Sequence, residues 1–313
     1  MPKQAQESYP EPSFQEWTKI WMKTNNTKLL FILRPNTSVK FDGFEVKLDD
    51  VTEITINARG WRDYEYNITK PNNTYRIIAV GDSYTLGPGV ELDNTYAKVL
   101  EKMLSQLNST FKYEVLNFGI IGYDTTSTVE LIKTKVLEYE PDVIIIGIGL
   151  LYYQVWYEQY FKNSNLTFNP SNIKKLTEQQ IKNLIIPEWL KQKIMILRNE
   201  TKNLCNAAEN VEPEEEEFCL KENFQKPINE LYKIIDTNKT RIIFIDFKNV
   251  ESLQKYVHNK TITIQYQEYY QRKKYEEKDI KLHLEDVHPN RMGHKLIAQA
   301  VYETLVNKKI ILT

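Results

Sequence analysis

Ser83 and His288 stand far apart in this 313-residue chain, yet each is surrounded by the residues that an activated hydroxyl nucleophile needs. An apolar run ends directly in Gly81-Asp82-Ser83, and two acids, Glu285 and Asp286, come just before His288. A serine hydroxyl attacks a carbonyl carbon efficiently only when a histidine takes its proton and a carboxylate orients that histidine. The set therefore predicts acyl-transfer chemistry at Ser83, with either acid as the partner of His288. The ordinary alternative for the acid–histidine cluster is a solvated surface turn.

The flanking segments predict how these residues are positioned. The apolar run before Ser83 is typical of a parallel strand covered on both faces, and Gly81 permits a sharp turn where the chain leaves the sheet. In open α/β sheets the site lies at the carboxyl ends of the strands, where Ser83 would then sit. An amphipathic helix is expected after His288, with apolar residues at helical spacing: Leu296, Ile297, Ala300, Val301 and Leu305.

Strand and helix patterns alternate along most of the chain, which predicts a parallel sheet with helices on both faces. The expected strands are Tyr75–Val80, Tyr113–Asn117, Val143–Ile148 and Arg241–Phe247, with a weaker one near Thr261–Gln267. One helix is expected from Asp93, as its N-cap, to about Leu107, and another at about Thr125–Tyr139.

With these elements in place, the chain resembles the SGNH (GDSL) hydrolases over roughly residues 74–310. The matching blocks are Gly81-Asp82-Ser83-Tyr84-Thr85-Leu86-Gly87, Val115-Leu116-Asn117-Phe118-Gly119-Ile120-Ile121-Gly122 and Asp286-Val287-His288-Pro289-Asn290. The resemblance implies a three-layer α/β/α, flavodoxin-like fold with a central parallel sheet. It also implies Ser83 as the nucleophile, His288 as the base, and an oxyanion hole that uses the backbone N–H groups of Ser83 and Gly122. Asp286 is preferred over Glu285 as the acid.

At the remaining conserved block, this chain departs from the family's pattern. The family continues after the third strand with Gly-x-Asn-Asp, in which the Asn side chain donates to the oxyanion. Here Gly149 is followed by Leu151 at the Asn position, and leucine has no donor. Removal of one oxyanion donor costs about 10²–10³-fold in rate. Either Tyr152, Tyr153 or Gln154 replaces it, or the enzyme is slow, or the site no longer catalyses.

The chain divides into an N-terminal extension with short β strands, residues 1–73, and an SGNH hydrolase-like domain, residues 74–313. The stretch from Asn57 to Asp63 is expected to pack along the edge of the core. A helical, cysteine-containing insertion is expected at about residues 152–238, which is longer than one crossover needs. Aromatic residues that open this insertion either border the site or pack a helical cap: Tyr152, Tyr153, Trp156, Tyr157, Tyr160 and Phe161.

Nine Asn-x-Ser/Thr sequons predict an exported glycoprotein, because occupied sequons mark the surface of secreted proteins. They begin at Asn25, Asn36, Asn67, Asn72, Asn108, Asn165, Asn199, Asn238 and Asn259. An Asn- and Thr-rich cytosolic protein is the alternative. Cys205 and Cys219 would close a loop of about 15 residues as a disulfide, which stabilises by about 3 kcal/mol; in a reducing compartment they would be two thiols. The expected location is extracellular or at the cell surface, with a leader or membrane anchor outside this sequence.

The net charge of −1, with dispersed Lys and Arg, argues against a nucleic-acid partner. No phosphate-binding loop or dinucleotide motif is present, so no cofactor is expected, and the spacing of His283, Glu285 and His288 fits no common zinc site. The sequence predicts a serine esterase acting on O-acyl esters, in particular acetyl esters of a small molecule or extracellular glycan. The alternatives are an O-acyltransferase that uses the same acyl-enzyme and a non-catalytic surface protein on the SGNH scaffold.

Overall fold

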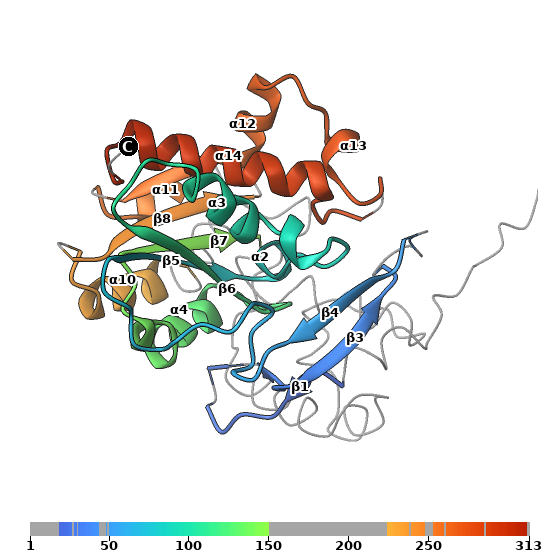
Figure 1. Cartoon of the computed structure of the whole chain (residues 1–313), viewed down its shortest axis with the longest axis horizontal. Helices are drawn as coiled ribbons and strands as arrows, with labels where there is room; N and C mark the ends of the chain where they lie inside the picture. The colour runs from blue at the N-terminus through green and yellow to red at the C-terminus, as the bar shows by residue number, and fades with distance from the viewer. Residues whose placement is uncertain are drawn as a thin grey trace, which may run out of the picture.

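The computed structural model describes residues 19–26, 28–29, 31–43, 48, 50–149, 224–237, 239–247, 253–259, 261–284 and 286–311. Its centre is a five-stranded sheet in the order β6-β5-β7-β8-β9, in which every neighbouring pair is parallel (Figure 1). Counted from β5 as the first strand, the order is 2-1-3-4-5, the flavodoxin-like order that was expected. The strands are β5 (Thr74–Gly81), β6 (Lys112–Gly119), β7 (Val143–Ile148), β8 (Arg241–Asp246) and β9 (Ile262–Gln265).

Helices cover both faces of this sheet, which makes the three layers. Alternate residues of β5 face opposite sides, as the period of a strand requires. Ile77 and Ala79 pack with α3 (Tyr96–Leu104) and α14 (Arg291–Asn307). Ile78 and Val80 pack on the other side with α4 (Thr125–Thr134) and α10 (Lys226–Ile234). Figure 1 shows the pair α3 and α14 above the sheet and the pair α4 and α10 below it. Within the described residues, none of the helices has both the length and the hydrophobicity needed to cross a bilayer.

Short helical elements complete the domain. They are α2 (Ser83–Leu86), η1 (Leu92–Asn94), η2 (Val136–Tyr139), α11 (Leu253–Tyr256), α12 (Tyr266–Arg272) and α13 (Glu277–Ile280). The expected helix at Thr125–Tyr139 is thus α4 followed by a turn of 3₁₀ helix, and the weak fifth strand ends at Gln265, where α12 begins.

The expectation that Asp93 is the N-cap of the helix that ends near Leu107, which is α3, is wrong. The N-cap of α3 is Thr95, whose hydroxyl accepts the N–H of Lys98, while Asp93 lies in η1 and its carboxylate accepts the hydroxyl of Tyr64. Three residues that favour N-caps follow one another here, Asp93, Asn94 and Thr95. Thr95 is the one that immediately precedes the apolar stripe of the helix.

The N-terminal extension forms two antiparallel hairpins. The first pairs β1 (Trp21–Met22) with β2 (Ile32–Leu33), and the second pairs β3 (Thr37–Phe41) with β4 (Thr52–Ile56). Residues of β4 alternate between buried and exposed, and Ile54 and Ile56 join the same hydrophobic core as Phe118 of β6. The extension therefore shares its core with the sheet domain rather than burying one of its own.

Candidate active site

Three glycines aligned across the sheet explain how Ser83 is presented. In the strand register Gly119 of β6 lies opposite Gly81 of β5, which lies opposite Gly147 of β7. A Cβ at Gly119 would stand 2.1 Å from the backbone N of Leu86, and a Cβ at Gly147 would stand 2.6 Å from Oγ1 of Thr85. Real Cβ atoms never approach so closely. Side chains at these positions would lift α2, which begins at Ser83, away from the ends of the strands.

The start of α2 is fixed by the residue before it. The side chain of Asp82 is the N-cap and accepts the N–H of Tyr84 at 2.9 Å. Asp82 is fully buried, and Ser83 itself is only 6% exposed. The serine therefore stands at the carboxyl end of β5, beside β7, which is the topological switch point where sites of open α/β folds are found.

The structure brings His288 and Asp286 to Ser83 although 205 residues separate the serine from the histidine. Nε2 of His288 lies 2.8 Å from Oγ of Ser83, and Nδ1 of His288 lies 2.6 Å from Oδ1 of Asp286. The side chain of Asp286 is 1% exposed and that of His288 is 13% exposed. A carboxylate only accepts, so the proton of a neutral His288 resides on Nδ1, and Nε2 is left to accept from the serine hydroxyl.

The loop that carries His288 is held between α13 and α14. The backbone carbonyl of His288 accepts the N–H of Leu282 at 2.8 Å. Two residues further on, Asn290 is the N-cap of α14 through Gly293 N–H at 3.0 Å, and its amide donates to the carbonyl of Lys281 at 2.9 Å. These contacts fix the histidine from both sides along the chain.

Aromatic rings pack beside the imidazole of His288. The ring of Tyr84 stacks on Phe247 with 4.7 Å between centroids and lies 5.6 Å from the ring of His288. The side chain of Tyr84 is buried beside Asp82 and Asp286, and burial together with these charges holds its pKa well above the ordinary value. Tyr84 thus stays neutral and limits the space in which the imidazole can turn.

Gly122, the other residue expected in the oxyanion hole, lies in a tight turn after β6. Its φ of +73° is in the left-handed region, which glycine adopts without steric cost. The turn is closed by a hydrogen bond from Tyr123 N–H to the carbonyl of Ile120 at 3.2 Å. Within the described part of the chain, no acceptor is bonded to the backbone N–H of Ser83 or of Gly122. Both groups have the capacity to donate to a bound oxygen.

Several residues that the sequence singled out lie outside the described residues. They are Glu285, Leu151, Tyr152, Tyr153, Gln154, the two cysteines Cys205 and Cys219, and the sequons at Asn165, Asn199 and Asn238. Of the two acids, Asp286 is the one whose contact with His288 falls within the described residues.

Two buried basic groups beside the site were not singled out from the sequence. His294 is wholly buried, and its Nδ1 accepts the N–H of Tyr96 at 3.2 Å. Burial lowers the pKa of His294 to about 3, with the nearby charge of Arg62 acting in the same direction, which favours the neutral imidazole. Arg62 is 1% exposed, and burial lowers the pKa of its guanidinium to about 10. The packing of the Asn57–Asp63 stretch against the core, which was expected, is what buries it.

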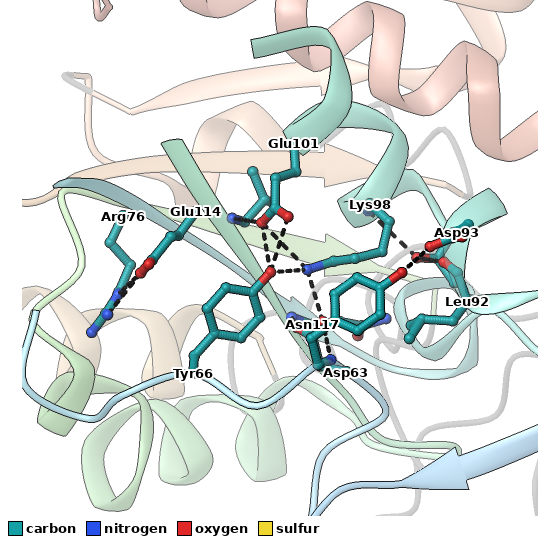
Figure 2. Close-up of polar contacts among 12 residues, drawn as sticks. Asp63, Tyr66, Arg76, Leu92, Asp93, Lys98, Glu101, Glu114 and Asn117 are labelled. Atoms are coloured by element: carbon teal, nitrogen blue, oxygen red, sulfur yellow. Dashed lines mark hydrogen bonds and ion pairs between the residues drawn. The ribbon is translucent and has the colours of Figure 1, made fainter. Parts of the chain in front are cut away.

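A buried ionic network joins the same stretch to α3 and β6 (Figure 2). Nζ of Lys98 lies 2.7 Å from a carboxylate oxygen of Asp63 and 2.8 Å from the hydroxyl of Tyr66, which in turn donates to Glu101 at 2.8 Å. The other oxygen of Asp63 accepts the backbone N–H of Asn117 at 2.6 Å. Burial raises the pKa of Asp63 to about 6, against the opposing effect of Lys98. The network ties the extension to the sheet.

The fold and this arrangement together define a three-layer α/β protein with a serine nucleophile site at the end of the first core strand. A family model described as GDSL-like lipase/acylhydrolase matches residues 77–301. The chain therefore belongs to this family, and it is a carboxylic ester hydrolase of the SGNH type. A search of curated proteins found no matching sequence.

The solved structures that this chain matches share little sequence with it. An α/β hydrolase enzyme from the metagenome of Lake Arreo, Spain, is 14% identical with a TM-score of 0.44, over 76% of this chain and 97% of that one. The lipase Lip_vut3 from a goat rumen metagenome is 14% identical with a TM-score of 0.42, over 73% and 96%. A mutant of Axe2, an acetyl-xylooligosaccharide esterase from Geobacillus, is 16% identical with a TM-score of 0.44, over 76% and 95%.

Proposed function

We propose that this protein is a serine esterase that hydrolyses O-acyl esters through Ser83. The observation that carries the proposal is the chain of contacts from Asp286 to His288 to Ser83, with 2.6 Å and 2.8 Å between the facing atoms. The nucleophile, base and orienting acid are within hydrogen-bond reach of one another, as nucleophilic catalysis requires. The two backbone N–H groups without an acceptor, of Ser83 and Gly122, are the candidates for binding the oxyanion.

The reaction follows from these positions. Nε2 of His288 takes the hydroxyl proton as Oγ of Ser83 bonds to the ester carbonyl carbon, and Asp286 stabilises the imidazolium that forms. The negative charge moves to the carbonyl oxygen, next to the N–H groups of Ser83 and Gly122. On collapse the bond to the alcohol oxygen breaks, and His288 gives its proton to that oxygen. Water then attacks the acyl-enzyme, again losing a proton to His288, and the acid is released as Ser83 regains its hydrogen.

The finer part of the proposal is that the acyl group is acetyl and the ester is on an extracellular glycan. The support for an extracellular substrate is the surface position of the sequons. All six sequon asparagines among the described residues are exposed: Asn25, Asn36, Asn67, Asn72, Asn108 and Asn259. Asparagines that build the fold, such as Asn57, Asn117 and Asn290, begin no sequon and are at least partly buried. This distribution suits a chain that is exported and glycosylated, where its substrate would be extracellular.

The test is intact mass after incubation with a fluorophosphonate, together with hydrolysis of p-nitrophenyl acetate. A single adduct is expected on the parent and none on Ser83→Ala. Ser127→Ala is the matched control, because Ser127 is equally buried near the start of another helix, α4, and should not alter labelling. Absence of any adduct on the folded parent over hours would overturn the proposal in favour of a binding protein on the same scaffold.

Three further experiments test the finer part and its alternative. Acetyl-bearing oligosaccharides should be deacetylated faster than a p-nitrophenyl ester of a long acyl chain. Slow hydrolysis that rises when an acceptor sugar is supplied would instead indicate an O-acyltransferase. Expression through a secretory pathway should give a protein whose mass falls on treatment with an N-glycosidase, and an unchanged mass would contradict export with glycosylation.

A further inference from the structure

Arg62, from the N-terminal extension, lies buried beneath the segment that leaves the nucleophile helix. Its Nη1 donates to the carbonyl of Leu86 at 3.0 Å and to that of Gly87, and its Nη2 donates to the carbonyl of Val90 at 2.6 Å. The guanidinium thus bonds three carbonyls within five residues of one another. The residues that carry these carbonyls lie only three to seven positions after Ser83 in the sequence.

This segment has no regular structure to satisfy its own carbonyls. It runs from the C-cap of α2 at Gly87, where φ is +75°, to the start of η1, and Leu86 and Val90 are almost fully buried. Buried carbonyls without a donor are costly, and the planar guanidinium with five N–H groups is the side chain best suited to bind several at once. Arg62 therefore replaces the hydrogen bonds that a helix or strand would have provided.

The extension also holds the turn that carries Gly122. The hydroxyl of Tyr123 donates to the backbone carbonyl of Phe31, and the two rings make an edge contact at 6.0 Å between centroids. Tyr123 and Ile121, the neighbours of Gly122, are each 1% exposed. Trp61, next to Arg62 in the chain, packs on Phe118 of β6 with 4.0 Å between centroids.

We propose that Arg62 and Tyr123 are positioning residues through which the N-terminal extension fixes the two backbone N–H groups of the oxyanion hole. Arg62 holds the segment after Ser83, and Tyr123 ties the turn of Gly122 to Phe31. The proposal rests on the proposed esterase function. The hole would depend on these two donors the more if Leu151 occupies the position of the family's donating Asn, as the sequence resemblance implies. A displacement of about 1 Å at such a site can cost about 10²-fold in rate.

The chain offers matched controls at the opposite end of β5. Arg76 is also fully buried, and its guanidinium donates to the carbonyls of Ile68 and Tyr139, each at 2.8 Å, and to Glu114. Tyr75 donates its hydroxyl to the carbonyl of Ile310 at 3.2 Å. Both lie at the amino end of the strand, whereas Ser83 follows its carboxyl end.

The experiment compares Arg62→Lys and Tyr123→Phe with Arg76→Lys and Tyr75→Phe. We expect the first pair to lower kcat for p-nitrophenyl acetate, and the rate of fluorophosphonate labelling, by tenfold or more with KM changed less than threefold. The pH at which kcat is half-maximal should not move, because the acid and base are untouched. In the two control variants we expect a lower midpoint of thermal unfolding than in the parent. Their kcat, counted per site that the fluorophosphonate labels, should stay within threefold of the parent value. If Arg62→Lys and Tyr123→Phe lose stability but keep the kcat of the parent, the proposal is overturned.

Hydrogen–deuterium exchange gives a readout that does not need activity. Arg62→Lys should speed exchange of the amides of residues 84–92, and Tyr123→Phe that of residues 120–125, while Arg76→Lys spares both. If the parent takes no fluorophosphonate label, the esterase function fails but the exchange pattern still decides whether the extension holds these segments. If Arg62→Lys does not fold, Tyr123→Phe, which removes one oxygen atom, carries the test.

Discussion

Oδ1 of Asp286 meets His288 at two points, since it accepts the backbone N–H of His288 at 2.9 Å and faces Nδ1 of the same residue at 2.6 Å. An acid two residues before a histidine can do this only when the intervening backbone turns back on itself. The contact therefore orients the imidazole through the loop conformation as well as through the ring. It makes the acid, base and loop one unit that approaches Ser83 together.

Asp286→Asn should lower kcat by about 10³–10⁴-fold while the protein stays folded. An amide can present its NH₂ group to Nδ1, which favours the tautomer that cannot take the proton of Ser83, as in the serine protease triad. Glu285→Gln is the matched comparison, since the sequence allows either acid, and it should keep kcat within threefold. Steady-state rates on p-nitrophenyl acetate decide between them. Equal losses in the two variants would mean that the acids act jointly.

Gly119→Ala should abolish labelling of Ser83 although Gly119 belongs to a neighbouring strand. The added Cβ would stand 2.1 Å from the backbone N of Leu86. A backbone atom of a packed helix cannot move out of the way alone, so the clash must shift a whole element. Relief requires α2 to shift with Ser83 on it, away from His288. Fluorophosphonate labelling measures the effect, and circular dichroism checks that the sheet persists. A folded variant that labels at the parent rate would show that α2 does not rest on this glycine.

The sequence was sufficient to predict the sheet, and it singled out Ser83, His288 and Asp286, whose side chains lie together in the structure. Long apolar runs that end in glycine are typical of buried parallel strands followed by a sharp turn. The residue types and spacing around Ser83 and His288 are typical of a nucleophile and its base. The contacts of Arg62 could not be predicted, because its acceptors are backbone carbonyls, which leave no pattern of side chains. The choice of Thr95 over Asp93 as N-cap depends on where the helix packs, which local propensity does not determine.

The buried pair of Lys98 and Asp63 should show strong coupling in a double-mutant cycle. Asp63→Asn removes the carboxylate nearest to the buried ammonium of Lys98 and leaves it with Glu101 at 3.4 Å, so we expect a loss of about 3 kcal/mol in the free energy of unfolding. Lys98→Met in that background should restore part of it, giving a coupling energy of about 1–3 kcal/mol.

Urea denaturation of the four proteins of this cycle measures the coupling energy. The control cycle is Lys273 with Glu303, a pair at 2.9 Å in which both side chains are 44% exposed. Such exposed pairs couple by less than about 1 kcal/mol. Similar values in the two cycles would show that burial adds nothing to the Lys98 pair.

His294 should make the protein lose stability as the pH falls from 7 to 5. Its pKa is about 3 in the folded protein and near 6.5 when unfolded, so across this range the unfolded chain binds a proton that the folded chain refuses. The contribution is fully present above pH 6.5 and declines by about 1.4 kcal/mol per pH unit below it. Asp63 and Asp124, whose pKa values burial raises to about 6, act in the opposite direction below that pH.

The pH dependence of His294 is therefore isolated by comparing variants rather than read from the parent alone. Between pH 7 and pH 5 the parent should lose about 2 kcal/mol more unfolding free energy than His294→Gln, as measured by urea denaturation. His283→Gln, at an exposed histidine, should follow the parent. The pH profile of kcat in folded His294→Gln should keep the parent's acid limb, because His288 carries the proton. A shifted acid limb would place His294 in the proton transfer, and equal pH slopes of stability would mean that His294 is protonated in the folded protein.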